Sequence, residues 1–232
     1  WMEYPVMTRT VSAGMAIDYR ELASGNFDGS VAEEAAQVQI DMNNKAVAYV
    51  LGIMKNSLAN NTKYVKNYAT YSGNAPTQAQ VDSMVAKMRK MGKVAILGDY
   101  GILSAICDWN GYKTVGDAKI PFYSPSQVEE IAKAGLNGFY KGSTLVELVN
   151  PYNYTKPLAD KTGFETYYAD DELYFTAAGN KSPLNIFRRG GITTMQGTDV
   201  ETGTIKTRFD MEIGADVTKG REFEIGMMAK EA

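Results

Sequence analysis

The stretch that decides the fold is VAEEAAQVQIDMNNKAVAYVLGIMKNSL, residues 31–58. Its apolar residues recur at a spacing of three or four, which places them on one stripe of an α-helix. Such a helix would be about 42 Å long, and it exceeds the roughly 10–14 residues of an average globular helix. The pattern predicts an amphipathic helix that spans a whole domain. The stripe comprises Val31, Ala35, Val38, Met42, Ala46, Tyr49, Ile53 and Met54.

The helix has a specific start signal. Ser30 and Glu33 have the spacing of a capping box, in which the serine hydroxyl accepts from a backbone N–H and the glutamate returns to the serine N–H. A coiled coil is the alternative, but the stripe is broad and rich in alanine, and no flanking charge pattern supports that structure. We therefore expect the helix to pack on a sheet, with Val38, Met42, Tyr49 and Ile53 against Phe209 and Met211.

The composition is that of a soluble globular chain. The chain has 232 residues, of which 44% are hydrophobic and 22% charged, so it can form one large domain or two small ones. A net charge of −3 argues against tight binding to nucleic acid. We expect no membrane span and no secretory leader, because no apolar run is long enough. Because the first residue is Trp1, we also expect that a preceding segment is missing.

Several kinds of chemistry are disfavoured by residue content. The chain has no histidine, which removes Ser-His-Asp triads, histidine metal sites and the commonest general base near neutral pH. Its single cysteine, Cys107, excludes an internal disulfide and suits a reducing compartment, and we expect it to be a small buried side chain. The sequence therefore predicts no catalytic, cofactor-binding or metal-ligating residues, and we expect the protein not to be an enzyme.

The segment 76–149 alternates between helix and strand patterns, which is typical of an α/β layer. A second capping box at Thr77 and Gln80 opens a helix whose apolar face holds Val81, Met84, Val85 and Met88. A buried strand at 93–97, a short helix at 102–109, a helix start at 124–127 and a strand at 143–149 are predicted to follow.

From about residue 166 the pattern changes to strands alone. Residues 204–213 alternate without a slip, and one face of this predicted strand holds Ile205, Thr207, Phe209, Met211 and Ile213. A second alternation follows at 222–227. The two strands could pair as a hairpin across 214–220, although that linker is longer than a tight turn needs.

Three short motifs have a functional and a structural interpretation. Gly98-Asp99-Tyr100-Gly101 follows a strand as a phosphate-binding turn would, but Asp99 would repel an anion, which favours an ordinary strand-to-helix turn. The acidic residues Asp170, Asp171 and Glu172 lack the loop of a calcium site and are interpreted as solvated turn charge. Arg188 and Arg189 are too few for a phosphate patch, which favours a surface turn or a salt bridge between subunits.

The order of these elements resembles the HK97-like major capsid proteins of tailed bacteriophages. The resemblance covers nearly the whole chain, and it rests on the arm, the long helix, the α/β segment, and the strands TIKTRFDME at 204–212 and GREFEIGMM at 220–228. It implies an α+β fold with a long spine helix, a peripheral β-rich domain and an axial α/β domain. It also implies that the last strand returns to the axial domain, against the hairpin interpretation, and we adopt that alternative.

The resemblance implies domain boundaries as well. Residues 1–29 would be an extended arm, the returning limb of a loop that reaches over a neighbouring subunit. Residues 30–75 and 166–216 would form the peripheral domain, and residues 76–165 and 217–232 the axial domain. In the type member a lysine on the extended loop cross-links subunits; residues 1–29 contain Arg9 and Arg20 but no lysine, which disfavours cross-linking.

The function implied is that of a head shell subunit which assembles into hexamers and pentamers around phage DNA. Its partners would be further copies of itself, scaffold, portal or decoration proteins, and DNA through weak contacts, with no cofactor and no membrane. It would be assembled in the bacterial cytoplasm and reside in the virion. Two alternatives stay open: an encapsulin-type nanocompartment shell, and a cytosolic α/β enzyme or ligand-binding protein centred on the 98–101 turn.

Overall fold

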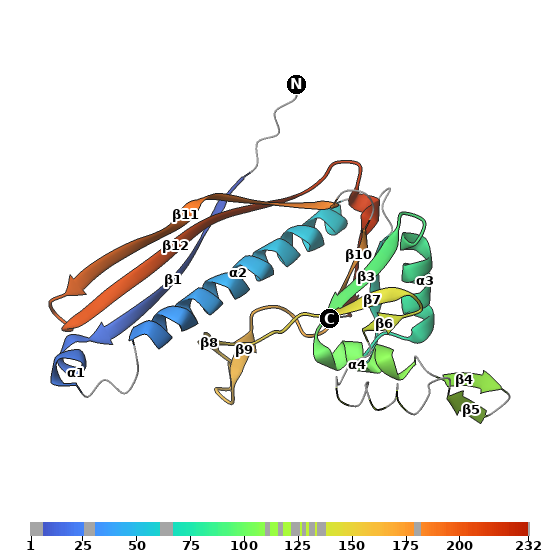
Figure 1. Cartoon of the computed structure of the whole chain (residues 1–232), viewed down its shortest axis with the longest axis horizontal. Coiled ribbons are helices and arrows are strands. Elements are labelled where there is room, and N and C mark those ends of the chain that lie inside the picture. Colours follow the sequence, from blue (N-terminus) through green and yellow to red (C-terminus); the bar gives the residue numbers. More distant parts are fainter. Residues whose placement is uncertain are drawn as a thin grey trace, which may run out of the picture.

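The chain mixes helices and strands in two bodies (Figure 1). An elongated body contains the long helix α2 and a three-stranded sheet, whereas a compact body contains a six-stranded sheet with two short helices. The predicted α+β class is therefore confirmed. No helix in the described part of the chain is long and apolar enough to span a bilayer. The computed structural model describes residues 7–25, 31–60, 67–109, 112–115, 118–121, 138–178 and 182–231, with residues 126, 129 and 133.

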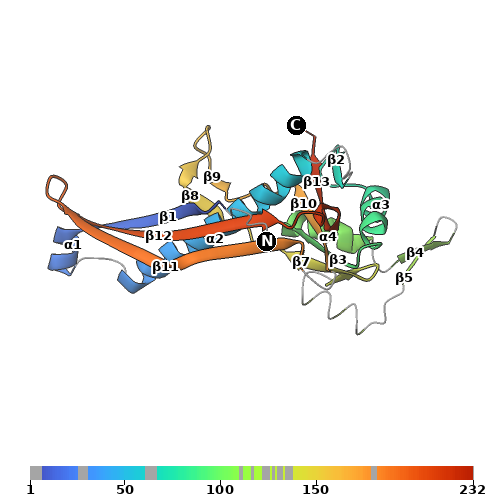
Figure 2. The ribbon, with the colours of Figure 1, turned by 90° about the horizontal axis from the view of Figure 1, so that it is seen from above.

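Helix α2 spans Val31–Asn60 and lies along one face of the three-stranded sheet (Figures 1 and 2). The sheet has the antiparallel order β1-β12-β11. The long helix predicted over 31–58 is confirmed, while Ser30 of its predicted capping box lies outside the described residues. The sheet strands are β1 (Arg9–Asp18), β11 (Leu184–Asp199) and β12 (Thr204–Val217).

The helix stripe packs on the sheet largely as predicted. A buried cluster joins Val38 and Met42 of α2 to Met211 of β12, with Tyr49 and Phe209 packed against it. Ile53 lies further along α2 and packs against a second cluster. This cluster contains Val217 of β12, from the same sheet, together with Met227 of the compact body.

Strand β12 confirms the predicted alternation. Its buried residues Thr207, Met211 and Ile213 share one face, whereas Lys206 and Arg208 are exposed on the other. The hairpin interpretation of the C-terminal segment is wrong. Strand β13 (Ile225–Lys230) leaves the elongated body and pairs with β10 and β2, so it crosses from the three-stranded sheet to the six-stranded sheet.

The compact body is built on a six-stranded sheet of order β2-β13-β10-β3-β7-β6. Helix α3 (Gln78–Met88) begins at the predicted Thr77 capping box and buries its four predicted apolar residues. Helix α4 (Tyr100–Asp108) adds Leu103 and Ile106 to the same core. The remaining strands are β2 (Tyr68–Tyr71), β3 (Lys93–Gly98), β6 (Phe139–Tyr140), β7 (Ser143–Glu147) and β10 (Glu172–Ala178).

The sheet pairings differ from the predicted division of the chain at β2 and β10. Strand β2 was expected in the peripheral domain, but it lies at an edge of the six-stranded sheet. Residues from 172 onward were expected in the long sheet, but β10 lies in the centre of the six-stranded sheet. Strand β10 is buried on both sides, with Leu173, Tyr174 and Phe175 all in hydrophobic cores. A strand with apolar residues on both faces needs cover on both faces. Helices α3 and α4 cover one face of β10, and the C-terminal part of α2 covers the other.

Smaller elements complete the chain. The predicted extended arm is extended only through β1, because α1 (Tyr19–Ser24) follows it with Asp18 as its N-cap. Strands β8 (Tyr152–Pro157) and β9 (Phe164–Thr166) form an isolated hairpin, and β4 (Tyr112–Val115) pairs with β5 (Ala118–Pro121). The helix start predicted at 124–127 lies outside the described residues, apart from Ser126, which is helical.

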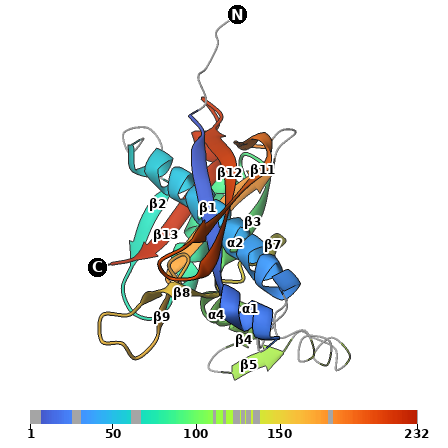
Figure 3. The same cartoon turned by 90° about the vertical axis from the view of Figure 1, so that its left-hand side faces the viewer.

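The two flanks of the elongated body carry different elements. Strand β11 lies on one side of α2, and the β8–β9 hairpin lies on the other, as both Figure 2 and Figure 3 show. The molecule therefore presents two unlike lateral surfaces.

The core side chain Tyr71 gives a pH-dependent prediction. It is buried in β2, and its hydroxyl donates to the carbonyl oxygen of Asp171 at 2.7 Å. Burial, with the charges of Asp171 and Glu172, raises the pKa of Tyr71 from 10.0 to about 12. As the pH rises, the tyrosine loses its proton first in the unfolded chain. The contribution of the Tyr71 hydroxyl to stability is therefore complete below about pH 10 and is lost as the pH approaches 12.

We therefore expect Tyr71→Phe to reduce the pH dependence of the urea midpoint between about pH 10 and 12. The exposed Tyr154, replaced by phenylalanine, is the matched control and should leave that slope as in wild type. An unchanged slope in Tyr71→Phe would show that the hydroxyl does not titrate differently on folding.

Candidate functional site

The glycine turn after β3 is built for packing. The Oδ2 atom of Asp99 accepts from the backbone N–H of Gly101 at 2.9 Å, so the start of α4 is capped by its own carboxylate. A Cβ atom on Gly98 would lie 2.6 Å from Leu173 of β10. This glycine permits close contact between neighbouring strands. The geometry supports the interpretation as a strand-to-helix turn and gives no place for a phosphate.

The acidic run 170–172 was interpreted as solvated turn charge, and that interpretation is wrong for Glu172, the first residue of β10. Its residue exposure is only 7%, and its carboxylate accepts from the ammonium of Lys55 and from the hydroxyl of Tyr174. Burial, and then the hydrogen bond to Glu172, raise the pKa of Tyr174. Among the described residues, no cluster of acidic or cysteine side chains could hold a metal ion.

This buried contact joins the two bodies of the molecule. Lys55 lies on the C-terminal half of α2, whereas Glu172 and Tyr174 lie on β10 in the compact body. The hydrogen bond that Lys55 donates to Glu172 raises the pKa of Lys55, which keeps the ammonium charged. A buried charge is tolerated when it is paired and hydrogen-bonded, as it is here. The contact fixes the position of α2 relative to the six-stranded sheet.

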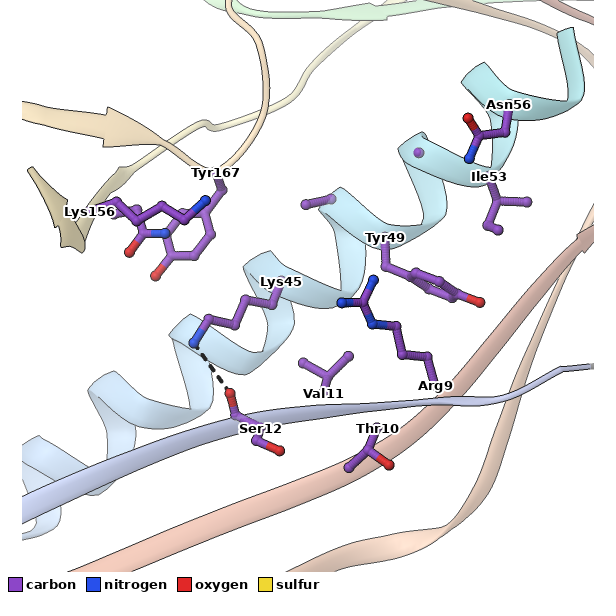
Figure 4. Close-up of a pocket in the computed structure, with 13 residues that line it drawn as sticks. Arg9, Thr10, Val11, Ser12, Lys45, Tyr49, Ile53, Asn56, Lys156 and Tyr167 are labelled. Carbon is purple, nitrogen blue, oxygen red and sulfur yellow. Dashed lines mark hydrogen bonds between the residues drawn. The ribbon is translucent and has the colours of Figure 1, made fainter. Parts of the chain in front are cut away.

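A cleft of about 570 Å³ lies between β1, α2 and the β8–β9 segment (Figure 4). Three cationic side chains line it, Arg9, Lys45 and Lys156, and no carboxylate does. Lys45 donates to the carbonyl oxygen of Ser12 at 3.3 Å and pairs with Asp41 at 2.6 Å. The hydroxyl of Tyr167 also donates to Asp41. The hydrogen bond from Tyr167 to Asp41 thus joins the segment after β9 to α2. The residues that line the cleft do not form an arrangement of nucleophile and base.

The edge strand β11 is the most exposed long element described. One edge of β11 pairs with β12, and its other edge has no partner strand in the described chain. Ile186 is 58% exposed and Met195 is 60% exposed, and neither contributes to a buried cluster. A long unpaired edge with apolar side chains is a template for pairing with another chain. Natural monomers avoid such an edge, so β11 is suited to contact between subunits.

Arg188 and Arg189, the arginine pair of the sequence, lie on this edge strand. They were interpreted as a surface turn or a salt bridge between subunits, but they lie within β11. The strand bulges directly after them, where Gly190 adopts a φ of 71°. Both arginines are exposed, and Arg189 pairs with Glu212 only at 3.7 Å. The turn interpretation is wrong, and the arginines stand on an open strand edge.

The β8–β9 hairpin forms a second exposed apolar surface. Tyr152 and Tyr154 are largely exposed, and the ring of Tyr154 packs edge-on against Phe164 at a centroid distance of 5.2 Å. An isolated two-stranded hairpin is marginally stable in water. Exposed aromatic residues on such an element are typical of contact surfaces. This hairpin was not predicted, although Tyr152 and Tyr154 alternate with polar residues as a strand would.

Cys107 was expected to be buried; it is only partly buried, and it packs against the core of the compact body. The described surfaces therefore point to assembly, with β11 and the hairpin as the exposed contact elements.

Comparisons with known proteins agree with this architecture. The family model described as "SPbeta prophage-derived putative capsid protein YonB" matches residues 1–229. No curated protein gives a significant match to the chain. Several solved structures are similar in fold despite low sequence identity.

A chain from Microbacterium phage Oxtober96 has a TM-score of 0.61 at 8% identity, with 97% of this chain and 73% of that chain covered. The capsid of an empty GTA particle has a TM-score of 0.57 at 14% identity, with 98% and 73% covered. The virus-like particle from Pyrococcus furiosus has a TM-score of 0.52 at 8% identity, with 97% and 76% covered. The chain has the HK97-like fold of phage capsid proteins, and it belongs to the YonB family of prophage-derived capsid proteins.

Proposed function

We propose that the chain is a major capsid subunit which assembles into hexamers and pentamers and encloses the DNA of a tailed phage or prophage. The observation that carries this proposal is the uncovered β11 edge, a strand from Leu184 to Asp199 with no partner on its outer side. Its exposed apolar side chains favour burial against another copy. The capsid family match supports the same conclusion.

The two bodies suggest separate roles in the shell. The elongated body, with α2 and the sheet β1-β12-β11, suits the peripheral domain, and the compact body suits the axial domain that gathers around symmetry axes. The sheet pairings favour boundaries that place β2 and β10 with the axial domain as well as β13. The residues before α1 suit an arm that contributes its strand β1 to the peripheral sheet.

We also propose partners and a location for the protein. The protein acts as a structural subunit and not as an enzyme, and its principal partner is itself. It is assembled in the bacterial cytoplasm and resides in the virion, with scaffold, portal or decoration proteins as further partners. An overall charge of −3 suits a container whose contacts with packaged DNA are weak.

Light scattering of the full-length protein tests this function. Heterologous contacts between copies that close produce rings, so we expect particles of megadalton mass or hexameric rings. Absorbance of purified particles at 260 and 280 nm then reports whether their contents are nucleic acid or protein. A monomer whose mass does not change with concentration would contradict the proposed function.

A further inference from the structure

The β11 flank carries a cationic centre with apolar neighbours. Arg188 and Arg189 are the only charged residues between positions 184 and 198. Ile186, Phe187 and Ile192 are exposed beside them. Arg188 has no ion-pair partner among the residues that the structure describes, and the contact of Arg189 with Glu212 is long, at 3.7 Å with a 79% exposed arginine side chain. Both guanidinium groups are therefore available to an incoming anion.

The hairpin flank carries the complementary chemistry. A groove of about 540 Å³ runs along β8 and β9, lined by apolar residues such as Tyr152, Leu158 and Phe164. Two carboxylates, Glu165 and Asp170, line the same groove, and both residues are exposed. Glu165 pairs with Lys156 at 3.8 Å, where both side chains are more than half exposed. An exposed pair of this length contributes little and can be exchanged for a better partner.

The two surfaces lie on opposite flanks of α2, as Figures 2 and 3 show, so a single copy cannot bring them together. We infer that β11 of one copy docks edge-on into the β8–β9 groove of the next copy. Arg188 and Arg189, which project from opposite faces of the strand, then reach Glu165 and Asp170 from the two sides of the inserted edge. This inference rests on the proposed function and specifies its partner as a second copy of this chain. Arginine suits the contact because its planar fork binds carboxylates in a bidentate geometry.

The contact is directional, because the two surfaces are unlike. A heterologous contact of this kind repeats from copy to copy and can close into a ring. The apolar residues on both sides supply buried area, and the charges supply register and choice of partner. The exposed hairpin becomes covered by the β11 edge, and the unpaired edge becomes covered by the hairpin.

Charge reversal tests the pairing on the full-length chain. We expect Arg188→Glu/Arg189→Glu and Glu165→Arg/Asp170→Arg each to lower the assembled fraction by at least about tenfold, because like charges then face each other. A 1:1 mixture of the two variants should restore assembly, since acidic edges meet basic grooves and basic edges meet acidic grooves. The two variants must alternate around a ring, so the mixture should form six-membered rings and be depleted in five-membered ones. Sedimentation velocity and negative-stain microscopy measure both results.

The control variant Lys90→Glu/Lys93→Glu has the same change in charge on exposed residues of the compact body, and it should assemble as wild type does. Asp170 also accepts from the side chain of Asn150, so Glu165→Arg alone provides a second groove variant if the double variant does not fold. The inference is overturned if either folded variant assembles normally by itself, or if the mixture fails to assemble. If wild type itself does not assemble, the proposed function fails; if wild type assembles and the reversals have no effect, only this interface is wrong.

Discussion

Replacing Phe175 with alanine is expected to lower the free energy of unfolding by about 3–5 kcal/mol. Phe175 lies in β10 at the centre of the six-stranded sheet, it has 0% exposure, and it is paired with Ile96 on β3 and Gly226 on β13. Truncation removes the buried ring and leaves a cavity in the core that the sheet forms with α3 and α4. Few single substitutions exceed this cost, so we expect a large loss of soluble folded protein.

Urea denaturation followed by circular dichroism measures this effect. Phe139→Ala is the matched control, because Phe139 belongs to β6 of the same sheet but is 61% exposed. The control should change the free energy of unfolding by about 0.5 kcal/mol or less. Equal effects of the two substitutions would contradict the assignment of the six-stranded sheet as the main core.

The second large effect is expected at the contact between the two bodies. Glu172→Ala removes the acceptor for Lys55 and for the buried hydroxyl of Tyr174. Leaving that hydroxyl unsatisfied costs about 1–3 kcal/mol. Loss of the pairing with the half-exposed Lys55 adds to this cost, reduced by solvent screening. We therefore expect the free energy of unfolding to fall by at least about 1–3 kcal/mol.

A double-mutant cycle separates the two partners of Glu172. In Tyr174→Phe the hydroxyl is absent, so the further replacement of Glu172 by alanine should cost less than it does in wild type. Glu172→Gln keeps a hydrogen-bond acceptor and should retain part of the stability. If Glu172→Ala has the same effect in both backgrounds, Tyr174 and Glu172 are not coupled, and the hydrogen bond between these two residues of β10 is wrong.

The elements that could be predicted are those whose signal is local. Helix α2 is confirmed because its stripe repeats over many turns, and α3 is confirmed because Thr77 and Gln80 specify its start within four residues. Strand β12 is confirmed because its buried and exposed residues alternate along one strand. Helix α1 was missed, although Asp18 and Gly25 are cap signals at its two ends.

The choice of strand partners could not be predicted from such patterns. Residues 222–227 alternate, but alternation describes the two faces of a strand and not its neighbours. Strand β13 pairs with β10 and β2, where its residues are buried on both sides, by the core with α3 and α4 on one face and by α2 on the other. The order of elements in a resembling family supplied this information where periodicity could not.

The same limit explains the error at the acidic run. Three adjacent acidic residues are usually solvated, but Glu172 is paired with a lysine 117 positions away in the sequence. The contact surfaces on β11 and the hairpin were only partly foreseen. The arginines of β11 were recognised as a possible salt bridge between subunits, whereas the hairpin groove depends on Glu165 and Asp170, which no motif connects with Arg188.

Electron microscopy of particles formed by the full-length protein tests the central claim most directly. A shell subunit with directional contacts should form closed particles whose surface resolves into groups of six and five copies. Monomers, or aggregates without groups of six or five, would contradict the assignment of this chain as a self-assembling capsid subunit.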